Sequence, residues 1–337
     1  MRLAVQQFPG HLTSLTELSL PLHVVHDISS VSGCVRLCDL RLLTDVCALR
    51  EWGEQEWDAL ARLTSLTCLH VDLGLHGNDQ AEAEAYYGVL RKLKALQMVG
   101  ASVWMPSVLP VLQSLTHVTA VFGGWEEDAA VNLTALTCPH IKELGKTFGV
   151  PFQAFPNLVC VAFDVVACQD FLALTSYCTG LQKLVLEEFC RPLTWGHGVN
   201  PIERRSALRS LAHLQHLTHL ELAPPGDAEL VAFTSAAAAL GSHRLRCLHV
   251  FGAPSVHALM QSLHGLQELH VHVSAKKSVM DTFTVEAVRM WLVGLAVVPR
   301  VYLVLHSAEQ QSVVDAARQW ATEMELPLPA VLKVSRA

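Results

Sequence analysis

The stretch LTSLTCLHV at residues 63–71 recurs with few changes as LTSLTELSL at 12–20, LQHLTHLEL at 214–222 and LHGLQELHV at 263–271. All four follow L-x-x-L-x-x-L-x-L, with valine also accepted at the last position. Eight looser copies begin at Cys34, Leu93, Leu112, Leu133, Phe155, Cys178, Ser242 and Leu295. Similarity within one chain at such intervals is typical of a solenoid. The alternation of apolar and polar residues at the end of each copy predicts a half-buried strand.

This pattern resembles the leucine-rich repeat family, in a divergent, intracellular type. The resemblance implies an α/β solenoid with a curved parallel β-sheet on its concave side and helices on its convex side. We therefore expect about twelve irregular repeats in residues 1–306, and a C-terminal helix and capping segment in residues 307–337. Thr284 and Ser307 are expected to start helices, because each directly precedes an amphipathic stretch. Trp52 and Trp57 are assigned to an outer-layer helix.

Two features depart from the family pattern. The position that usually holds asparagine or cysteine after each strand holds other residues here, among them Trp104 and Gly123. The turns must therefore satisfy their backbone groups in another way. In addition, the repeats begin at Leu12, although terminal repeats usually need a polar cap. Either the first repeats pack against something else, or the sequence is a piece of a longer protein.

Composition narrows the classes of partner. Of the 337 residues, 51% are hydrophobic and 16% are charged, which favours a continuous packed core. The net charge of −7 disfavours nucleic-acid binding, and no apolar stretch reaches the roughly 18 residues that a membrane span needs. Ten cysteines occur without a CxxC pair, and no secretory signal is recognised. We therefore expect reduced thiols in a cytoplasmic protein that binds another protein, without nucleic acid or membrane insertion.

The polar positions of the strands form two columns on the concave face, because residues two apart on a strand share a face. The predicted frame places His117, Thr119, Cys138 and His140 in these columns. The densest predicted patch comes from the copies that end at 222, 250 and 271. It comprises His219, Glu221, Cys247, His249, Glu268, His270 and His272.

Imidazole and thiolate groups in this patch would suit zinc if they approached one another. The close local spacing of a dedicated zinc site is absent, however, and a repeat whose polar positions favour histidine produces alternating histidines by itself. The sequence therefore favours a histidine-rich partner-binding face, with ordinary solvated sheet surface as the alternative. It predicts no metal and no cofactor.

A second candidate is the long connection after Leu186, where Trp195 and His197 lie between glycines. An exposed tryptophan there would be an anchor for a partner. The alternative is that Trp195 packs back onto the edge of the solenoid.

No catalytic motif supports an enzyme: GxSxG, HExxH, P-loop and GxGxxG are all absent from the sequence. The predicted function is a noncatalytic intracellular scaffold that binds proteins through its concave face. One alternative is the substrate-recognition part of an F-box-type ubiquitin-ligase complex, although no F-box precedes the repeats in this chain. Another is a structural component of the cytoskeleton or the ciliary axoneme.

Overall fold

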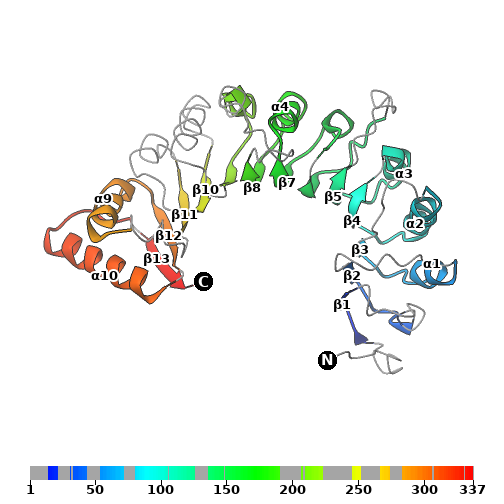
Figure 1. The fold of residues 1–337 in the computed structure, drawn as a ribbon, viewed down its shortest axis with the longest axis horizontal. Helices are drawn as coiled ribbons and strands as arrows, with labels where there is room; N and C mark the ends of the chain where they lie inside the picture. The colour runs from blue at the N-terminus through cyan, green and yellow to red at the C-terminus, as the bar shows by residue number, and fades with distance from the viewer. Residues whose placement is uncertain are drawn as a thin grey trace, which may run out of the picture. The chain divides into compact units, whose positions relative to one another are not determined.

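The computed structural model divides the chain into two compact units, Met1–Leu158 and Val159–Ala337, and each is described by itself. Within each unit, parallel strands are hydrogen-bonded in chain order, with helices along one side of the sheet (Figure 1). The structure describes residues 14–21, 31, 33–43, 54–71, 80–104, 106–125, 136–147, 149–189, 206–207, 209–222, 245–251, 266–273, 283–305, 307–329 and 331–336.

The first unit alternates short strands with helices or 3₁₀ turns. Parallel pairing requires a crossover between strands, and the helices supply it. The elements are β1 (Glu17–Pro21), β2 (Asp39–Leu43), α1 (Glu54–Ala61), β3 (Cys68–Val71), α2 (Gln80–Lys92), β4 (Met98–Trp104), η4 (Pro106–Val108), α3 (Leu109–Ser114), β5 (Ala120–Trp125), β6 (Glu143–Thr147) and η6 (Phe152–Ala154).

The second unit continues the same alternation. Its last strand pairs with the one before it over six residues, so the segment after the final helix belongs to the sheet. The elements are β7 (Cys160–Val166), α4 (Cys168–Tyr177), β8 (Lys183–Phe189), η7 (Leu211–His213), β9 (His219–Leu222), β10 (Cys247–Phe251), β11 (Glu268–Val273), α9 (Val285–Leu295), β12 (Arg300–Leu305), α10 (Ala308–Glu323) and β13 (Val331–Arg336).

The leucines of the repeat form the core, as the sequence predicts. Leu40 and Leu69 in the first unit, and Leu184 and Leu269 in the second, are fully buried. Leu18 of β1 is only half-buried. Parallel strands with inward leucines and flanking helices make the fold an α/β solenoid of the leucine-rich-repeat type. We use "concave face" for the face of the strands that carries the alternating polar residues.

The predicted frame is wrong by three residues in the copy at 112–120. β5 pairs Val121 with Val99 and Phe122 with Gly100. His117 and Thr119 therefore precede the strand, and the concave position belongs to Phe122.

The copy at 133–141 is shifted further, by five residues. β6 pairs Gly145 with Phe122, and Cys138 and His140 lie before the strand. In both copies L-x-x-L fits at a second offset. In the first, apolar residues recur at every third position, so it fits again three residues later; in the second, Cys138, Ile141 and Leu144 form a separate series five residues after Leu133, Leu136 and Pro139. Only pairing with the neighbouring strand selects the register. The apolar residues that permit the ambiguity are Leu112, Leu115, Val118 and Val121, and then Cys138, Ile141 and Leu144.

Buried aromatic residues hydrogen-bond backbone carbonyl groups of strands β4 and β5 in the first unit. The Trp104 indole N–H donates a hydrogen bond to the Phe122 carbonyl oxygen at 2.8 Å, and the Tyr86 hydroxyl donates to the Gly100 carbonyl oxygen at 3.1 Å. The Trp104 ring also stacks on Tyr86, with centroids 6.0 Å apart. The tryptophan at the position where leucine-rich repeats usually hold asparagine thus donates to the backbone of the neighbouring strand β5.

Helix starts agree with the sequence. The Thr284 and Ser307 hydroxyls accept hydrogen bonds from backbone N–H groups three residues later, at 3.2 and 3.1 Å, and so cap α9 and α10. Trp57 is buried on α1, as expected for an outer-layer helix. Trp52 lies outside the described residues.

Candidate functional site

The predicted histidine-rich residues occupy neighbouring strands of the second unit. β9 supplies His219 and Glu221, β10 supplies Cys247 and His249, and β11 supplies Glu268, His270 and His272. Register pairing aligns them into the two concave columns. One column reads Val185, Glu221, His249, His270, Tyr302 and Lys333, and the other reads Lys183, His219, Cys247, Glu268 and Arg300.

The rings of the first column stack on one another. His249 and His270 have ring centroids 3.9 Å apart and planes inclined by 11°, and His270 and Tyr302 follow at 4.3 Å and 10°. His272 lies farther from His249, at 6.3 Å between centroids. Lys333 places its ammonium 5.7 Å from the centre of the Tyr302 ring. Parallel strands lie about 4.8 Å apart, so side chains at paired positions come into van der Waals contact. We call His249, His270 and Tyr302 the ring ladder.

Glu268 fixes the orientation of the central ring. Its Oε1 lies 3.1 Å from His270 Nε2, and because a carboxylate only accepts, Nε2 carries the proton. Arg300 approaches the other carboxylate oxygen at 3.8 Å. In the neutral ring the lone pair therefore lies on Nδ1.

Burial sets the protonation states at the centre of the patch. Desolvation lowers the pKa of His249 to about 4, and the positive charges of His270, His272 and Lys183 act in the same direction, while Glu268 opposes them. The pKa of the Cys247 thiol is raised to about 11, first by burial and then by Glu268 and Glu221. At neutral pH the His249 ring is therefore neutral and the Cys247 thiol keeps its proton.

Cys247, His249 and His270 form a compact group of potential metal ligands. One ligand atom from each lies within 4.8 Å of the other two. In the part of the chain that the structure describes, this is the one group of three that meets this geometry.

The outer members of the predicted patch stand apart from this group. His219 is exposed, and its Nδ1 hydrogen-bonds the Thr218 hydroxyl at 2.8 Å. Glu221 is half-buried and lies opposite His249 on the neighbouring strand β9. The sequence prediction of this patch omitted Tyr302 and Arg300. Both residues occupy positions of the two predicted columns, and this placement could have identified them from the sequence.

Trp195 and His197, the predicted loop contact, lie outside the described residues. Eight of the ten cysteines are described, and these eight form no disulfide bond there. No helix among the described residues is long and apolar enough to cross a bilayer.

No protein-family model and no curated protein matches this chain. Among solved structures, the crystal structure of the TLR13–ssRNA13 complex is similar at 14% sequence identity, with a TM-score of 0.42. The similarity covers 90% of this chain and 47% of that chain, so this chain spans about half the length of that protein.

Proposed function

We propose that this protein is a noncatalytic scaffold that binds another protein through the concave face of its second unit. The proposed contact surface comprises His219, Glu221, Cys247, His249, Glu268, His270 and His272. Trp195 and His197 are proposed as a further contact from the neighbouring connection. The ring ladder is the observation that carries the proposal.

The ring ladder favours binding on entropic grounds. Its rings are half-buried and held by stacking, so few rotamers remain to be lost when a partner covers them. The His249 ring is neutral at physiological pH, and a neutral ring costs less to desolvate than an imidazolium. Aromatic side chains flanked by charges such as Glu268 and Arg300 are typical of the core and rim of a protein interface.

The titration behaviour of the patch argues against catalysis. A thiol whose pKa is about 11 is mostly protonated at neutral pH, so Cys247 is a poor nucleophile. A histidine whose pKa is about 4 is a weak general base. We place the scaffold in the cytoplasm, where the buried thiols of Cys34, Cys138 and Cys178 stay reduced.

The test is capture of partners from a cytosolic extract on immobilised protein, with quantification by mass spectrometry. The His249→Ser, His270→Ser, Tyr302→Ser triple variant removes the ring ladder. The matched control, Gln311→Ala with Gln319→Ala, changes two residues of α10. Circular dichroism and thermal unfolding establish that each variant is folded.

We expect at least one protein that the parent and the helix control retain equally. The ladder variant should retain it roughly tenfold less, which corresponds to about 1.4 kcal/mol. Equal capture by the ladder variant would overturn the proposed surface. The absence of any saturable partner in the parent's capture would overturn the scaffold function.

A further inference from the structure

We infer that Cys247, His249 and His270 form a binding site for a borderline-soft divalent metal ion, with Zn²⁺ as the best fit, and that Glu268 positions one ligand. The site shares its residues with the proposed contact surface but requires no partner protein. It also departs from the sequence prediction, in which the spacing favoured no metal.

The sheet brings the ligands together. Cys247 and His249 are two apart on β10 and share a face, and β11 pairs His270 directly with His249. Their ligand atoms already lie within 4.8 Å of one another. Tetrahedral zinc, with bonds of about 2.0–2.3 Å, needs ligand atoms roughly 3.3–3.7 Å apart. The ligand atoms must therefore approach one another by roughly 1 Å, and rotation of the side chains can supply this without a change in the backbone.

Glu268 provides the carboxylate hydrogen bond that metal-binding histidines usually have on the ring nitrogen that does not bind the metal. The His270 Nε2–H donates to the carboxylate, which leaves Nδ1 with the lone pair for the ion. Arg300 approaches the other oxygen of Glu268 and helps to hold the carboxylate. Glu268 is thus a positioning residue that fixes the tautomer of His270.

The ligand set fits zinc better than a hard cation. Imidazole nitrogens and a thiolate suit Zn²⁺, whereas Mg²⁺ and Ca²⁺ prefer oxygen ligands. The Cys247 thiol is protonated without the ion, so binding releases its proton to solvent as the sulfur–metal bond forms. Three protein ligands leave a tetrahedral ion one further position, which a water molecule fills.

Metal binding and ring stacking exclude one another. An imidazole binds a metal in the plane of its ring, and His249 and His270 lie in nearly parallel planes, 3.9 Å between centroids. Both can hold one ion only if at least one ring rotates about its Cβ–Cγ bond. Binding should therefore be accompanied by loss of the His249–His270 stack.

The test is a titration of the purified, chelator-treated full chain with Co²⁺, followed by displacement with Zn²⁺. We expect about one ion per chain, a thiolate-to-cobalt charge-transfer band, visible bands of tetrahedral cobalt, and release of about one proton per ion. Histidine ring resonances should shift as the stack opens. Zn²⁺ should then abolish the cobalt bands.

Variants assign the signal to the site. Cys247→Ser should abolish the thiolate band, and His270→Gln should also remove tetrahedral binding. Glu268→Gln should keep the band but weaken the affinity roughly 10- to 100-fold. Cys68→Ser is the matched control, because Cys68 is half-buried at the same strand position of the first unit, and it should bind as the parent does.

The outcomes separate this inference from the proposed function. Absence of the thiolate band in the folded parent, or its persistence in Cys247→Ser, would overturn the metal site and leave partner binding untouched. Conversely, a metal site that binds as expected in a protein that captures no partner would overturn only the scaffold proposal.

Discussion

The same four residues, Cys-Leu-His-Val, form β3 at 68–71 and most of β10 at 247–250. Both copies bury the leucine and the valine and turn the histidine toward the concave face. The neighbouring strands differ. β4 offers Met98 and Gly100 to the first copy, whereas β11 offers Glu268 and His270 to the second.

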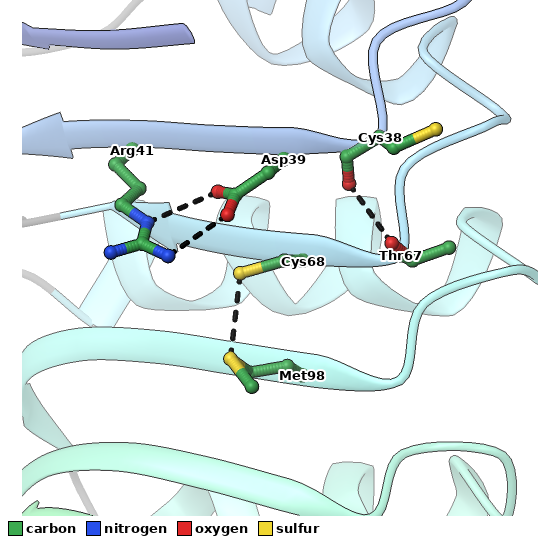
Figure 2. Close-up of polar contacts among 6 residues, drawn as sticks. All are labelled: Cys38, Asp39, Arg41, Thr67, Cys68 and Met98. Carbon is green, nitrogen blue, oxygen red and sulfur yellow. Dashed lines mark hydrogen bonds and ion pairs between the residues drawn. The ribbon is translucent and has the colours of Figure 1, made fainter. Parts of the chain in front are cut away.

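In the first unit, the neighbouring strand leaves room for a ring. The His70 ring lies against Gly100, where an added Cβ would collide with His70 Nδ1. Figure 2 shows the Cys68 sulfur directed at the Met98 sulfur, 3.5 Å away, beside the paired Asp39 and Arg41. The arrangement recurs farther along, where Phe122 lies against Gly145.

In the second unit, no glycine lies opposite the histidine. The position opposite His249 carries His270, so the two rings stand against each other and stack. Identical local sequence therefore gives a ring over glycine in one unit and a ring ladder in the other. The cross-strand neighbour, and not the repeat itself, therefore decides the chemistry of the concave face.

Substitution of a strand glycine in the first unit should have the greatest consequence for stability. Such glycines have no counterpart in β9–β12. Gly123 has a φ of 121°, a backbone conformation that residues with a side chain rarely adopt. An added Cβ would also collide with the Ala101 carbonyl oxygen. Gly123→Ala should lower the free energy of unfolding by roughly 3–5 kcal/mol, measured by urea denaturation. Gly33→Ala is the control, because an added Cβ there meets nothing within 4 Å. Equal losses in both variants would contradict the role assigned to Gly123.

A smaller effect tests the ring over glycine itself. Gly100→Ala forces the His70 ring to move, and overpacking of this kind costs about 1–3 kcal/mol. In a His70→Ala background the same substitution should cost almost nothing. The double-mutant cycle, measured by urea unfolding, should therefore give a coupling energy of about 1 kcal/mol or more. Additive effects would mean that the His70 ring swings aside freely and that Gly100 is not needed for it.

The architecture was open to prediction from the sequence because one residue pattern encodes it. Leucines at the strand ends predicted the inward face at Leu69, Leu184 and Leu269, and an oxygen-bearing side chain before an amphipathic stretch predicted the caps at Thr284 and Ser307. Register failed only where apolar residues recur every third position, as before β5 and β6.

The sequence could predict which residues belong to the site, but not how their side chains are arranged. The alternation of apolar and polar residues identified His249 and His270 as concave residues. It did not distinguish them from His70, which occupies the same position in the other Cys-Leu-His-Val copy. The stack, the Glu268 contact and the ligand-like group depend on which strands pair and in what register. Those pairings join residues about 20 or more positions apart, and no local spacing rule contains them.

Acidification should weaken the second unit by on the order of 1 kcal/mol. The folded pKa of His249, about 4, lies below its ordinary value of 6.5, so the unfolded chain takes up the proton first. Stability from this group is thus complete above pH 6.5 and is lost as pH falls from 6.5 toward 4. The charged groups around the ring are His270, His272 and Lys183, with Glu268 opposing, and Glu221 lies at the paired position of β9.

The measurement is urea unfolding across this pH range in the presence of a chelator. His249→Gln should reduce the pH dependence, and the part that remains includes His140 of the first unit, whose pKa burial also lowers. An undiminished slope in His249→Gln would assign the pH dependence to other groups. A slope of opposite sign would mean that Glu268 outweighs burial.

The smallest effect concerns the ion pair beside the first Cys-Leu-His-Val copy. The Arg41 guanidinium donates to both carboxylate oxygens of Asp39, at 3.2 and 2.9 Å, but the Arg41 side chain is 55% exposed. Asp39→Asn should therefore cost less than about 1 kcal/mol of stability, and the cost should shrink in high salt. The more informative consequence of this substitution is a change in the pKa of the Cys68 thiol.

Burial is the first cause that raises the pKa of Cys68 to about 11, and the Asp39 charge is the second, opposed by Arg41. Removing the Asp39 charge should lower this pKa while leaving it above the ordinary 9.0, because burial remains. The pH profile of thiol alkylation, resolved by peptide mapping, should shift for Cys68 and stay fixed for Cys247. The charges near Cys247 belong to Glu268, Glu221, Lys183 and Arg300. Arg41→Gln is the opposite control and should slow the alkylation of Cys68. If both cysteines shifted together in Asp39→Asn, the substitution would be altering the fold, and the local chemistry of the two copies would not be independent.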